Sequence, residues 1–433
     1  MHRIQEQLTK SFYVLISLPA TAMGFALSIQ ISALSWLLTT KYNLHIDEVG
    51  FVWAAGPLAG IFGQVIIGLI SDKVWFWGGR RRPFVLIGGV LAAGMLIALP
   101  NIDVITAQLG IKSLLVVAIV VALTLDLAIN ISFNPTRSII ADVTPEGNPR
   151  TKGYTWMQTI SGFFGVLAYL IGATLGNYIL IYVGVVLVFL FSFVPMFFIT
   201  ENRQLHGAAE NETKNKAATA TEWGQLFRIY FAHAFSWIGI QTMFVYIIAF
   251  IQQKYFNGID DQSVINARSG QIIAISFAIL NTIGFILPAF VLEPIVEQIG
   301  RVRTHIMCVA IMSLGYFCIV FWGTAPFLLY ILMAVAGIGW AAVVSLPFAI
   351  MTEKIDQSRT GFFMGIFNLS VVLPQLLVSL FVGTIVKNTV DKNIIFIISG
   401  ISLALSAMFW TIVKEKRISG ESGISTPRST HLE

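Results

Sequence analysis

Long apolar stretches recur along this 433-residue chain from its beginning to its end. Each holds about 20 residues, the length that an α-helix needs to cross roughly 30 Å of hydrocarbon. The short alternating strands that build a membrane β-barrel are not seen in the sequence. We predict about twelve membrane-spanning helices, centred near Gly24, Leu58, Val90, Leu123, Val166, Val188, Phe244, Leu280, Ser313, Ala336, Val371 and Leu403. The expected fold class is an all-α polytopic membrane protein.

The composition agrees with this fold class. The chain is 56% hydrophobic and only 11% charged, whereas a soluble domain carries about 25% charged residues. The formal net charge of +5 is spread over several short connections rather than gathered in one patch, so we expect no nucleic-acid partner.

Basic residues are concentrated in every second connection between the apolar stretches. This set includes Lys73, Arg80, Arg81, Arg82, Arg150, Lys152, Arg203, Lys214, Lys216, Arg301, Arg303, Lys354 and Arg359, with Arg3, Lys10, Lys414, Lys416 and Arg417 near the termini. The other set holds only Lys41, Lys112, Lys254, Arg268, Lys387 and Lys392. By the positive-inside rule, both termini and the central loop are cytoplasmic, and the chain is predicted to be a multi-pass protein of the cell (inner) membrane.

The chain looks duplicated. An acid followed by a glycine and a basic cluster comes after the second apolar helix, in 71–82, and again after the eighth, in 296–303. A second acid-to-basic pattern follows the fourth helix, in 141–153, and the tenth, in 352–361. We predict a six-helix bundle over 1–201, a cytoplasmic linker over 202–222, a second bundle over 223–417 and a disordered tail over 418–433. Such a repeat places a substrate site between the two bundles near the middle of the bilayer.

The repeated loop residues have a mechanical interpretation. An acid near helix termini can accept backbone N–H groups and pair with arginine, holding helices together in one conformation and releasing them in another. The alternative is that the basic residues only anchor the loops on the cytoplasmic side. The predicted gating residues are Asp72, Arg80, Arg81, Arg82, Asp142, Arg150, Glu297, Arg301 and Arg359.

One carboxylate, Asp126, lies near the middle of an apolar stretch. With Asn130, Asn134 and Arg137 it forms a stripe on one helical face, because their offsets of four, eight and eleven residues fit the α-helical period. A charge at that depth is costly, so a functional role is the default expectation. If Asp126 borders a cavity that alternates between a dry and a water-filled state, it could bind a proton in the dry state and release it in the water-filled state. Alternatively, Asp126 is a structural acid satisfied by Asn130 or by a facing hydroxyl group.

Arg137 lies about 16 Å from Asp126 along the helix axis, too far for direct pairing. We expect it to face the cytoplasmic half of a cavity, or to pair with Asp142 or with an acid of another helix. A positioning role and a coupling role both remain open.

Several segments together resemble one family. They are Gly68-Leu69-Ile70-Ser71-Asp72-Lys73 with Gly79-Arg80-Arg81-Arg82-Pro83-Phe84, Asp126-Leu127-Ala128-Ile129-Asn130 with Pro135-Thr136-Arg137 and Ala141-Asp142, Ser345-Leu346-Pro347-Phe348-Ala349, and Met364-Gly365-Ile366-Phe367-Asn368-Leu369 with Val372-Leu373-Pro374-Gln375. The combination resembles the major facilitator superfamily, and within it a bacterial member of the sucrose–proton symporter branch of glycoside-pentoside-hexuronide:cation symporters. The resemblance implies that Asp126 is the proton-coupling acid and that Arg137 is needed for coupled transport.

Sugar recognition calls for amide side chains that pair with hydroxyl groups and for aromatic rings that cover the C–H face of a pyranose. The candidates that we favour are Asn130, Gln158, Trp237, Gln241 and Asn368; the others are Gln30, Gln64, Tyr246, Asn281 and Gln375. Any of these amides could instead bridge two helices.

The sequence thus predicts a secondary transporter, a monomer that carries a di- or oligosaccharide together with a proton by alternating access. The sugar stays open between sucrose, maltose and a related glucoside, because the seventh helix lacks acids that the plant symporters carry at its outer end. Sodium coupling, facilitative transport and a non-transporting sugar receptor are the alternatives. We find no catalytic cluster, metal-ligand array or nucleotide loop, so we expect no enzyme activity, no metal and no cofactor.

Overall fold

The structure is a computed structural model that describes residues 3–61, 70, 74–145, 148–201, 221–355 and 360–415. Within these ranges the chain is helical, and the β-structure is limited to an isolated bridge between Phe76 and Gly79. The predicted linker therefore lies mostly outside the described residues, and the predicted tail lies wholly outside them. The predicted domain boundaries stay predictions.

The helices follow one another with short connections. Their bounds are α1 (Arg3–Glu6), α2 (Lys10–Thr40), α3 (Ile46–Trp53), α5 (Arg82–Ala98), η1 (Leu99–Asn101), α6 (Ile102–Gln108), α7 (Leu114–Val143), α8 (Asn148–Leu175), α9 (Asn177–Phe193), η2 (Val194–Phe197), α11 (Trp223–Phe256), α12 (Gln262–Leu287), η3 (Pro288–Leu292), α13 (Glu293–Ile299), α14 (Arg301–Trp322), α15 (Pro326–Thr352), α16 (Thr360–Leu377), η5 (Val378–Val382), α17 (Gly383–Asn388) and α18 (Ile394–Trp410). The segments η3 and η5 are π-helical continuations of α12 and α16.

Ten helices in the described part of the chain are long and apolar enough to cross a membrane, and α18 is a shorter apolar helix of 17 residues. Of the predicted second crossing, centred near Leu58, the structure describes α3 and the residues up to 61; the rest lies outside the described residues. These helices are those expected from the apolar stretches of the sequence.

Local signals in the sequence set several helix ends. The Thr9 hydroxyl accepts a hydrogen bond from the backbone of Phe12 at the start of α2, and Asp261 caps α12 in the same way. Gly176 and Gly300 have φ values of +92° and +91°, a conformation that glycine adopts without strain. They form the tight turns from α8 to α9 and from α13 to α14.

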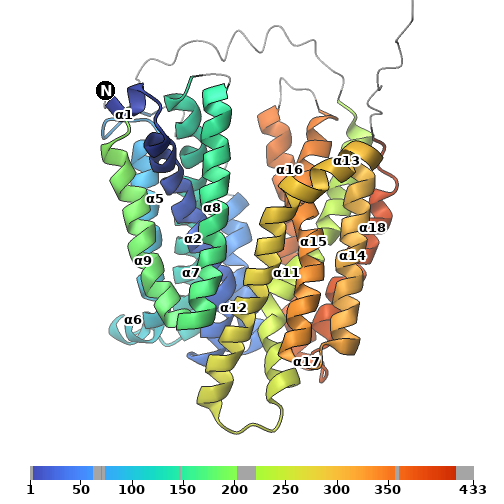
Figure 1. The fold of residues 1–433 in the computed structure, drawn as a ribbon. Helices are drawn as coiled ribbons and strands as arrows, with labels where there is room; N and C mark the ends of the chain where they lie inside the picture. The colour runs from blue at the N-terminus through green and yellow to red at the C-terminus, as the bar shows by residue number, and fades with distance from the viewer. Residues whose placement is uncertain are drawn as a thin grey trace, which may run out of the picture.

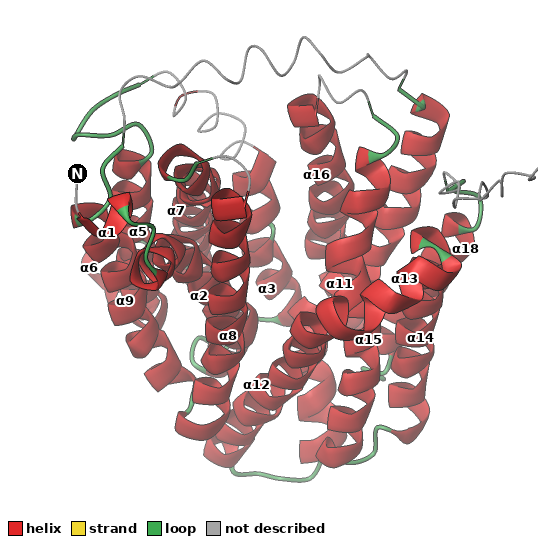
Figure 2. Ribbon diagram, turned by 45° about the horizontal axis from the view of Figure 1, so that its top comes forward, coloured by secondary structure: helices red, strands yellow, loops and turns green. Residues whose placement is uncertain are grey.

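The helices pack in two groups (Figures 1 and 2). Helices α2, α5, α7, α8 and α9, with the short helices α3 and α6, form the first group, which we call the N-group; α11, α12, α14, α15, α16 and α18, with the short segments η3, α13, η5 and α17, form the second, the C-group. The groups meet where α12 packs on α8 and α2, and where α3 packs on η5 and α17. We call the end that holds α1 and α13 the terminal end, and the end that holds α6 and α17 the far end (Figure 1).

Candidate functional site

The Asp126 side chain points into the protein. It is only 6% exposed, and the Gln30 amide on α2 donates a hydrogen bond to its Oδ2 atom at 3.0 Å. A Cβ atom on Gly56 would lie 3.3 Å from the same oxygen, so backbone at the start of the second crossing passes directly beside the carboxylate. Asp126 is therefore enclosed by α2, α7 and the segment around Gly56.

The Gln30 amide has a further property. Its Oε1 atom is buried and has no hydrogen-bond partner among the described residues. Gln30 therefore offers Asp126 a donor that is in use and an acceptor that is unused. A carboxylate can only accept a hydrogen bond, whereas a protonated carboxyl group can also donate one. The pair can accommodate both protonation states.

The rest of the predicted polar stripe makes local contacts. Asn130 donates to the backbone carbonyl of Asp126 at 2.8 Å, within α7. Arg137 is exposed, with its guanidinium 4.5 Å from the centroid of the Phe133 ring, and it forms no ion pair with the described residues. The predicted alternative that Arg137 pairs with Asp142 is wrong, because Asp142 is taken by arginines of another segment.

A central cavity of about 1090 Å³ lies between the N-group and the C-group. Its walls come from α2, α8, α12, η3 and α15, and they extend from mid-helix glycines toward the terminal end. The lining residues are Gly24, Ser28, Tyr154, Thr155, Gln158, Thr159, Ser161, Gly162, Gly165, Val166, Asn281, Gly284, Phe285, Pro288, Phe290, Trp340, Val344 and Ser345. The cavity combines amide and hydroxyl groups with aromatic rings.

A hydrogen-bonded group organises one wall of the central cavity. The Trp340 indole donates to Oδ1 of Asn281 at 3.3 Å, and the amide nitrogen of Asn281 donates to the Phe277 carbonyl at 2.9 Å. Behind it, the ring of Trp237 lies 6.1 Å from that of Trp340 and donates to His233 at 2.9 Å. Trp340 was not among the residues predicted from the sequence, since a tryptophan within an apolar helix gives no sign of facing a cavity.

The predicted sugar-binding residues thus fall into different places. Gln158 and Asn281 line the central cavity, and Trp237 supports it from behind. Asn368 and Gln375 on α16 are half-buried, and Gln241 is buried in α11; none of the three is a lining residue. Gln64 lies outside the described residues.

Tyr246 is also placed away from the central cavity. It is fully buried, and its hydroxyl group donates to the Val378 carbonyl at 3.2 Å. A Cβ atom on Gly50 would lie 2.5 Å from this hydroxyl oxygen, and one on Gly383 would lie 3.0 Å from it, at the contact of α3 with η5 and α17. Tyr246 is therefore part of the packing that joins the two groups at the far end.

Direct bonds between the N-group and the C-group close the far end. Lys387 donates to Asp47 at 2.9 Å, and the Trp36 indole donates to the Asn266 carbonyl at 2.6 Å. In the described part of the terminal end, no ion pair joins the two groups. The structure is therefore closed at the far end, with its central cavity reaching toward the terminal end.

The Asp47–Lys387 pair has a defined pH dependence. Partial burial is the largest single influence and raises the pKa of Asp47, but the hydrogen bond and charge of Lys387 together with backbone hydrogen bonds outweigh it, so the pKa lies below the ordinary aspartate value. Such a pair stabilises the closed end above the ordinary pKa of about 3.9, and the stabilisation is lost as the pH falls through the lowered value. Its contribution should be constant between about pH 5 and pH 8.

Replacing Lys387 with glutamine should shift the far end toward its open state by up to about fivefold, because a partly exposed ion pair contributes up to about 1 kcal/mol. Pulsed EPR between spin labels on cysteines that replace Lys112 and Asn257, in far-end loops of the two groups, measures this shift. The control is Lys392→Gln, since Lys392 bonds only to carbonyls of its own group. An equal shift in the control would contradict the assignment.

Charged side chains form a network at the terminal end of the N-group. Arg80 and Arg81 approach Asp142 at 2.9 Å and 3.5 Å. The Glu201 carboxylate accepts hydrogen bonds from the backbone N–H groups of Arg80, Arg81 and Arg82 at 2.8, 2.9 and 2.7 Å. Glu201 thus caps the start of α5. The side chain of Arg82 lies over the Phe197 ring.

The C-group repeats this arrangement. Arg301 pairs with Glu353 at the end of α15, and its backbone N–H donates to Glu415, which follows α18. In this conformation the acid that pairs with Arg301 is Glu353 rather than Glu297, whose gating role stays a prediction. Glu297 is exposed and makes no ion pair in the described part of the chain, since it lies on α13, before the turn at Gly300.

Sequence reasoning missed Glu201 and Glu415 as network members. A comparison of the two halves could have found them, because each follows the last crossing of its group. Of the other predicted gating residues, Asp72 and Arg359 lie outside the described residues, and Arg150 lies on α8 without a described side chain.

Comparison with known proteins agrees with this architecture. The family model of the Major Facilitator Superfamily matches residues 16–379, and a further match covers 265–429. The sucrose transport protein SUC4 of Arabidopsis thaliana is 23% identical over 442 aligned residues, covering 84% of this chain and 82% of the relative. A general alpha-glucoside permease of Schizosaccharomyces pombe is 29% identical over 174 residues, which cover 36% of this chain and 31% of the permease.

Solved structures share the fold. The D-xylose-proton symporter superposes with a TM-score of 0.70 at 17% identity, over 92% of this chain and 96% of that structure. The nucleoside transporter NupG superposes with a TM-score of 0.68 at 14% identity, over 94% of this chain and 100% of that structure. The chain therefore belongs to the Major Facilitator Superfamily and is a multi-pass membrane transporter built from two pseudo-symmetric six-helix bundles.

Proposed function

We propose that this transporter carries a di- or oligosaccharide, such as sucrose, maltose or a related glucoside, together with a proton. Relatives described as sucrose transport proteins align with more than four fifths of the chain, and the alpha-glucoside permease aligns with a shorter part. In this proposal the protein works as a monomer in the cell (inner) membrane. The terminal end is cytoplasmic, as the distribution of basic residues predicts, so the structure corresponds to an inward-facing state.

The central cavity is the proposed sugar site. Amide groups of Gln158 and Asn281 and hydroxyl groups along α8 can pair with sugar hydroxyls, while Trp340 and Phe285 can cover apolar ring faces. The walls belong to both groups of helices, so a bound sugar contacts both. Its affinity then depends on how the groups sit relative to each other, which alternating access requires.

Asp126 is the proposed proton-coupling acid. Ser28 and Gln30 both lie on α2, and a separation of two residues places them about 200° apart around the helix. One face of α2 therefore lines the central cavity while the opposite face contacts Asp126. Protonation of Asp126 would add a donor toward the unused Oε1 atom of Gln30. The change in this hydrogen bond would act on a helix that also touches the sugar.

The charge networks at the terminal end are the proposed cytoplasmic gate. Arg80 and Arg301 hold equivalent positions in the two groups, and each pairs with an acid at the end of another helix of its own group. Each network fixes its group as a body that can rotate as a whole. Arg137, exposed on α7 near the terminal end, is the proposed residue that positions this region for coupling.

The observation that carries the proposal is a cavity with the chemistry of a sugar site, shared between two groups of helices and bordered by the helix that contacts a buried acid. Exchange of labelled maltose or sucrose by counterflow in proteoliposomes tests it directly. A receptor would bind sugar without exchanging it. If the protein exchanged neither maltose nor sucrose nor any other glucoside, the proposal would be wrong.

Asn281→Ala should weaken the apparent sugar affinity in counterflow about tenfold, because the central cavity loses an amide and Trp340 loses its acceptor. The matched control is Asn101→Ala, since Asn101 is an amide at the far end that bonds only to the carbonyl of Ile97. The control should keep the wild-type affinity. Equal affinities in all three proteins would place the sugar elsewhere.

A further inference from the structure

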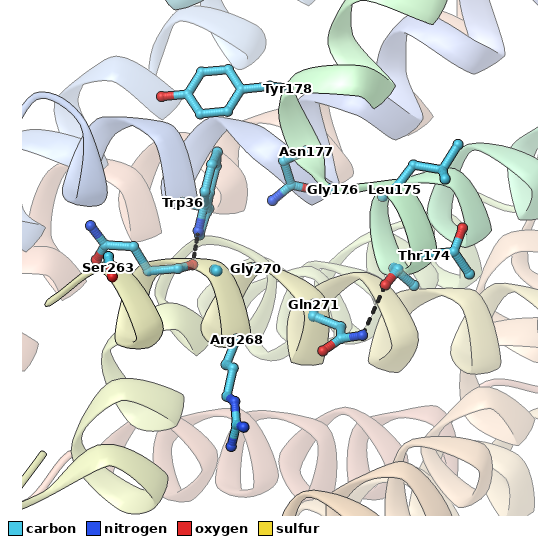
Figure 3. Close-up of a pocket in the computed structure, with 14 residues that line it drawn as sticks. Trp36, Thr174, Leu175, Gly176, Asn177, Tyr178, Ser263, Arg268, Gly270 and Gln271 are labelled. Atoms are coloured by element: carbon cyan, nitrogen blue, oxygen red, sulfur yellow. Dashed lines mark hydrogen bonds between the residues drawn. The ribbon is translucent and has the colours of Figure 1, made fainter. Parts of the chain in front are cut away.

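A second cavity lies at the far end, apart from the central cavity. Its volume is about 490 Å³, within the range of roughly 300–1,000 Å³ that small-molecule sites occupy. The end of α2, the turn between α8 and α9 and the first turns of α12 form its walls (Figure 3). None of its lining residues lines the central cavity.

A buried, unpaired amide lies in the wall of this far-end cavity. Asn177 is only 4% exposed, and neither its Nδ2 nor its Oδ1 atom has a hydrogen-bond partner among the described residues. Two glycines hold it in place: a Cβ atom on Gly172 would lie 3.0 Å from Oδ1, and one on Gly270 would lie 2.8 Å from Nδ2. Leaving a buried amide unpaired costs free energy, so a small turn of the side chain that lets a polar ligand in the cavity pair with it would be stabilising.

The rim of the far-end cavity carries aromatic and polar groups. Trp36 and Tyr178 meet edge to face, with their ring centroids 5.5 Å apart. Thr174, Ser263 and Gln271 are exposed around the opening. Hydroxyl and amide groups beside aromatic rings suit a ligand with many hydroxyl groups and apolar ring faces.

The charge of the lining favours a neutral ligand. No acidic side chain lines the far-end cavity. Arg268 is the one charged lining residue, and its guanidinium points away from Trp36 and Asn177 (Figure 3). An anion would need that guanidinium to turn toward the amide. A sugar or polyol could bind to the hydroxyl groups, amide groups and aromatic rings of the lining without any change in the position of Arg268.

The far-end cavity is made by both groups of helices. The Trp36 indole on α2 donates to the Asn266 carbonyl on α12, and the Gln271 amide on α12 donates to the Ala173 carbonyl on α8 at 3.1 Å (Figure 3). Opening the far end would break these bonds and separate the walls. The cavity therefore exists only while the far end is closed.

We propose that the far-end cavity is a second ligand site, which takes a neutral sugar or polyol and holds the far end closed. A ligand that binds one conformation shifts the protein toward it. High sugar concentration on the far side would then slow the transport cycle. This inference does not depend on the central cavity carrying sugar.

The test uses the purified full-length chain and equilibrium binding of radiolabelled maltose, sucrose and sorbitol. Asn177→Leu removes the unpaired amide at similar volume, and Ala267→Trp fills the cavity from an exposed position on α12. In an Asn281→Ala background, which weakens the central cavity, each should reduce the remaining binding of at least one probe by about tenfold or more. In counterflow, both variants should keep basal exchange and lose inhibition by high far-side sugar.

Unchanged binding in both variants would overturn the proposal, as would a failure of all three probes to bind. Citrate binding in place of the neutral probes would overturn the ligand class. If Asn177→Leu does not fold, Ala267→Trp decides alone. If sugar bound to the far-end cavity but not to the central cavity, only the proposed function would be wrong, and the second-site proposal would stand.

Discussion

Asp126→Asn should abolish proton-driven accumulation of sugar while leaving counterflow exchange largely intact. With one proton per sugar, a gradient of one pH unit supports about tenfold accumulation, because one pH unit corresponds to about 1.4 kcal/mol. An amide cannot take up or release the proton, so accumulation should fall to the level of simple equilibration. The amide can still accept from the Gln30 side chain and can donate to its unused Oε1 atom. The variant should therefore fold and imitate the protonated state.

Uptake of labelled sugar into proteoliposomes, with and without an inward proton gradient, measures this effect. Asp103→Asn is the matched control, because Asp103 is an exposed acid of the same group that pairs with Lys41 at the far end. The control should accumulate sugar as the wild type does. An Asp126→Asn protein that still concentrated sugar would show that another group carries the proton.

Glu201→Ala should lower the stability of the N-group by about 3 kcal/mol or more. Glu201 is 7% exposed, and its carboxylate accepts hydrogen bonds from three backbone N–H groups. The substitution would leave all three N–H groups without their charged acceptor. A hydrogen bond to a charged group contributes about 1.5–3 kcal/mol, and such contributions within one network are not additive. Thermal unfolding of the purified protein in detergent should show a midpoint several degrees lower.

Two controls separate this cap from a general effect of removing an acid. Glu415→Ala should cost less, because Glu415 accepts a single backbone N–H, that of Arg301. Glu297→Ala should change stability by less than about 0.5 kcal/mol, since Glu297 is an exposed side chain without an ion pair in the described ranges. Equal losses in all three variants would mean that the three N–H bonds to Glu201 contribute little.

The pattern of charges predicted part of the terminal-end network. The repeated loops identified Arg80, Arg81, Asp142 and Arg301, because acid and basic clusters recur at equal places in the two halves. The sequence did not show that Glu201 and Glu415 close these networks. Which acid reaches which arginine depends on how the ends of different helices come together, and separation along the chain does not contain that information.

The candidate sugar residues show the same division. Of the amides predicted as sugar-binding candidates, Gln158 and Asn281 do line the central cavity. Tyr246 has a similar position in the sequence but packs at the far end, where its hydroxyl group meets a backbone carbonyl. Helical periodicity gives the direction of a side chain relative to its own helix. It does not give the direction of the neighbouring helix.

By itself, the sequence determined the membrane-spanning helices, the duplication and the unusual position of Asp126, because hydrophobic length and the cost of buried charge act on each segment separately. The tertiary structure alone decided that Gln30 faces Asp126, that Trp340 and Asn281 share a wall, and that Asn177 lies unpaired in a far-end cavity. These facts arise from packing between helices that are distant in the chain, and only the folded arrangement fixes them.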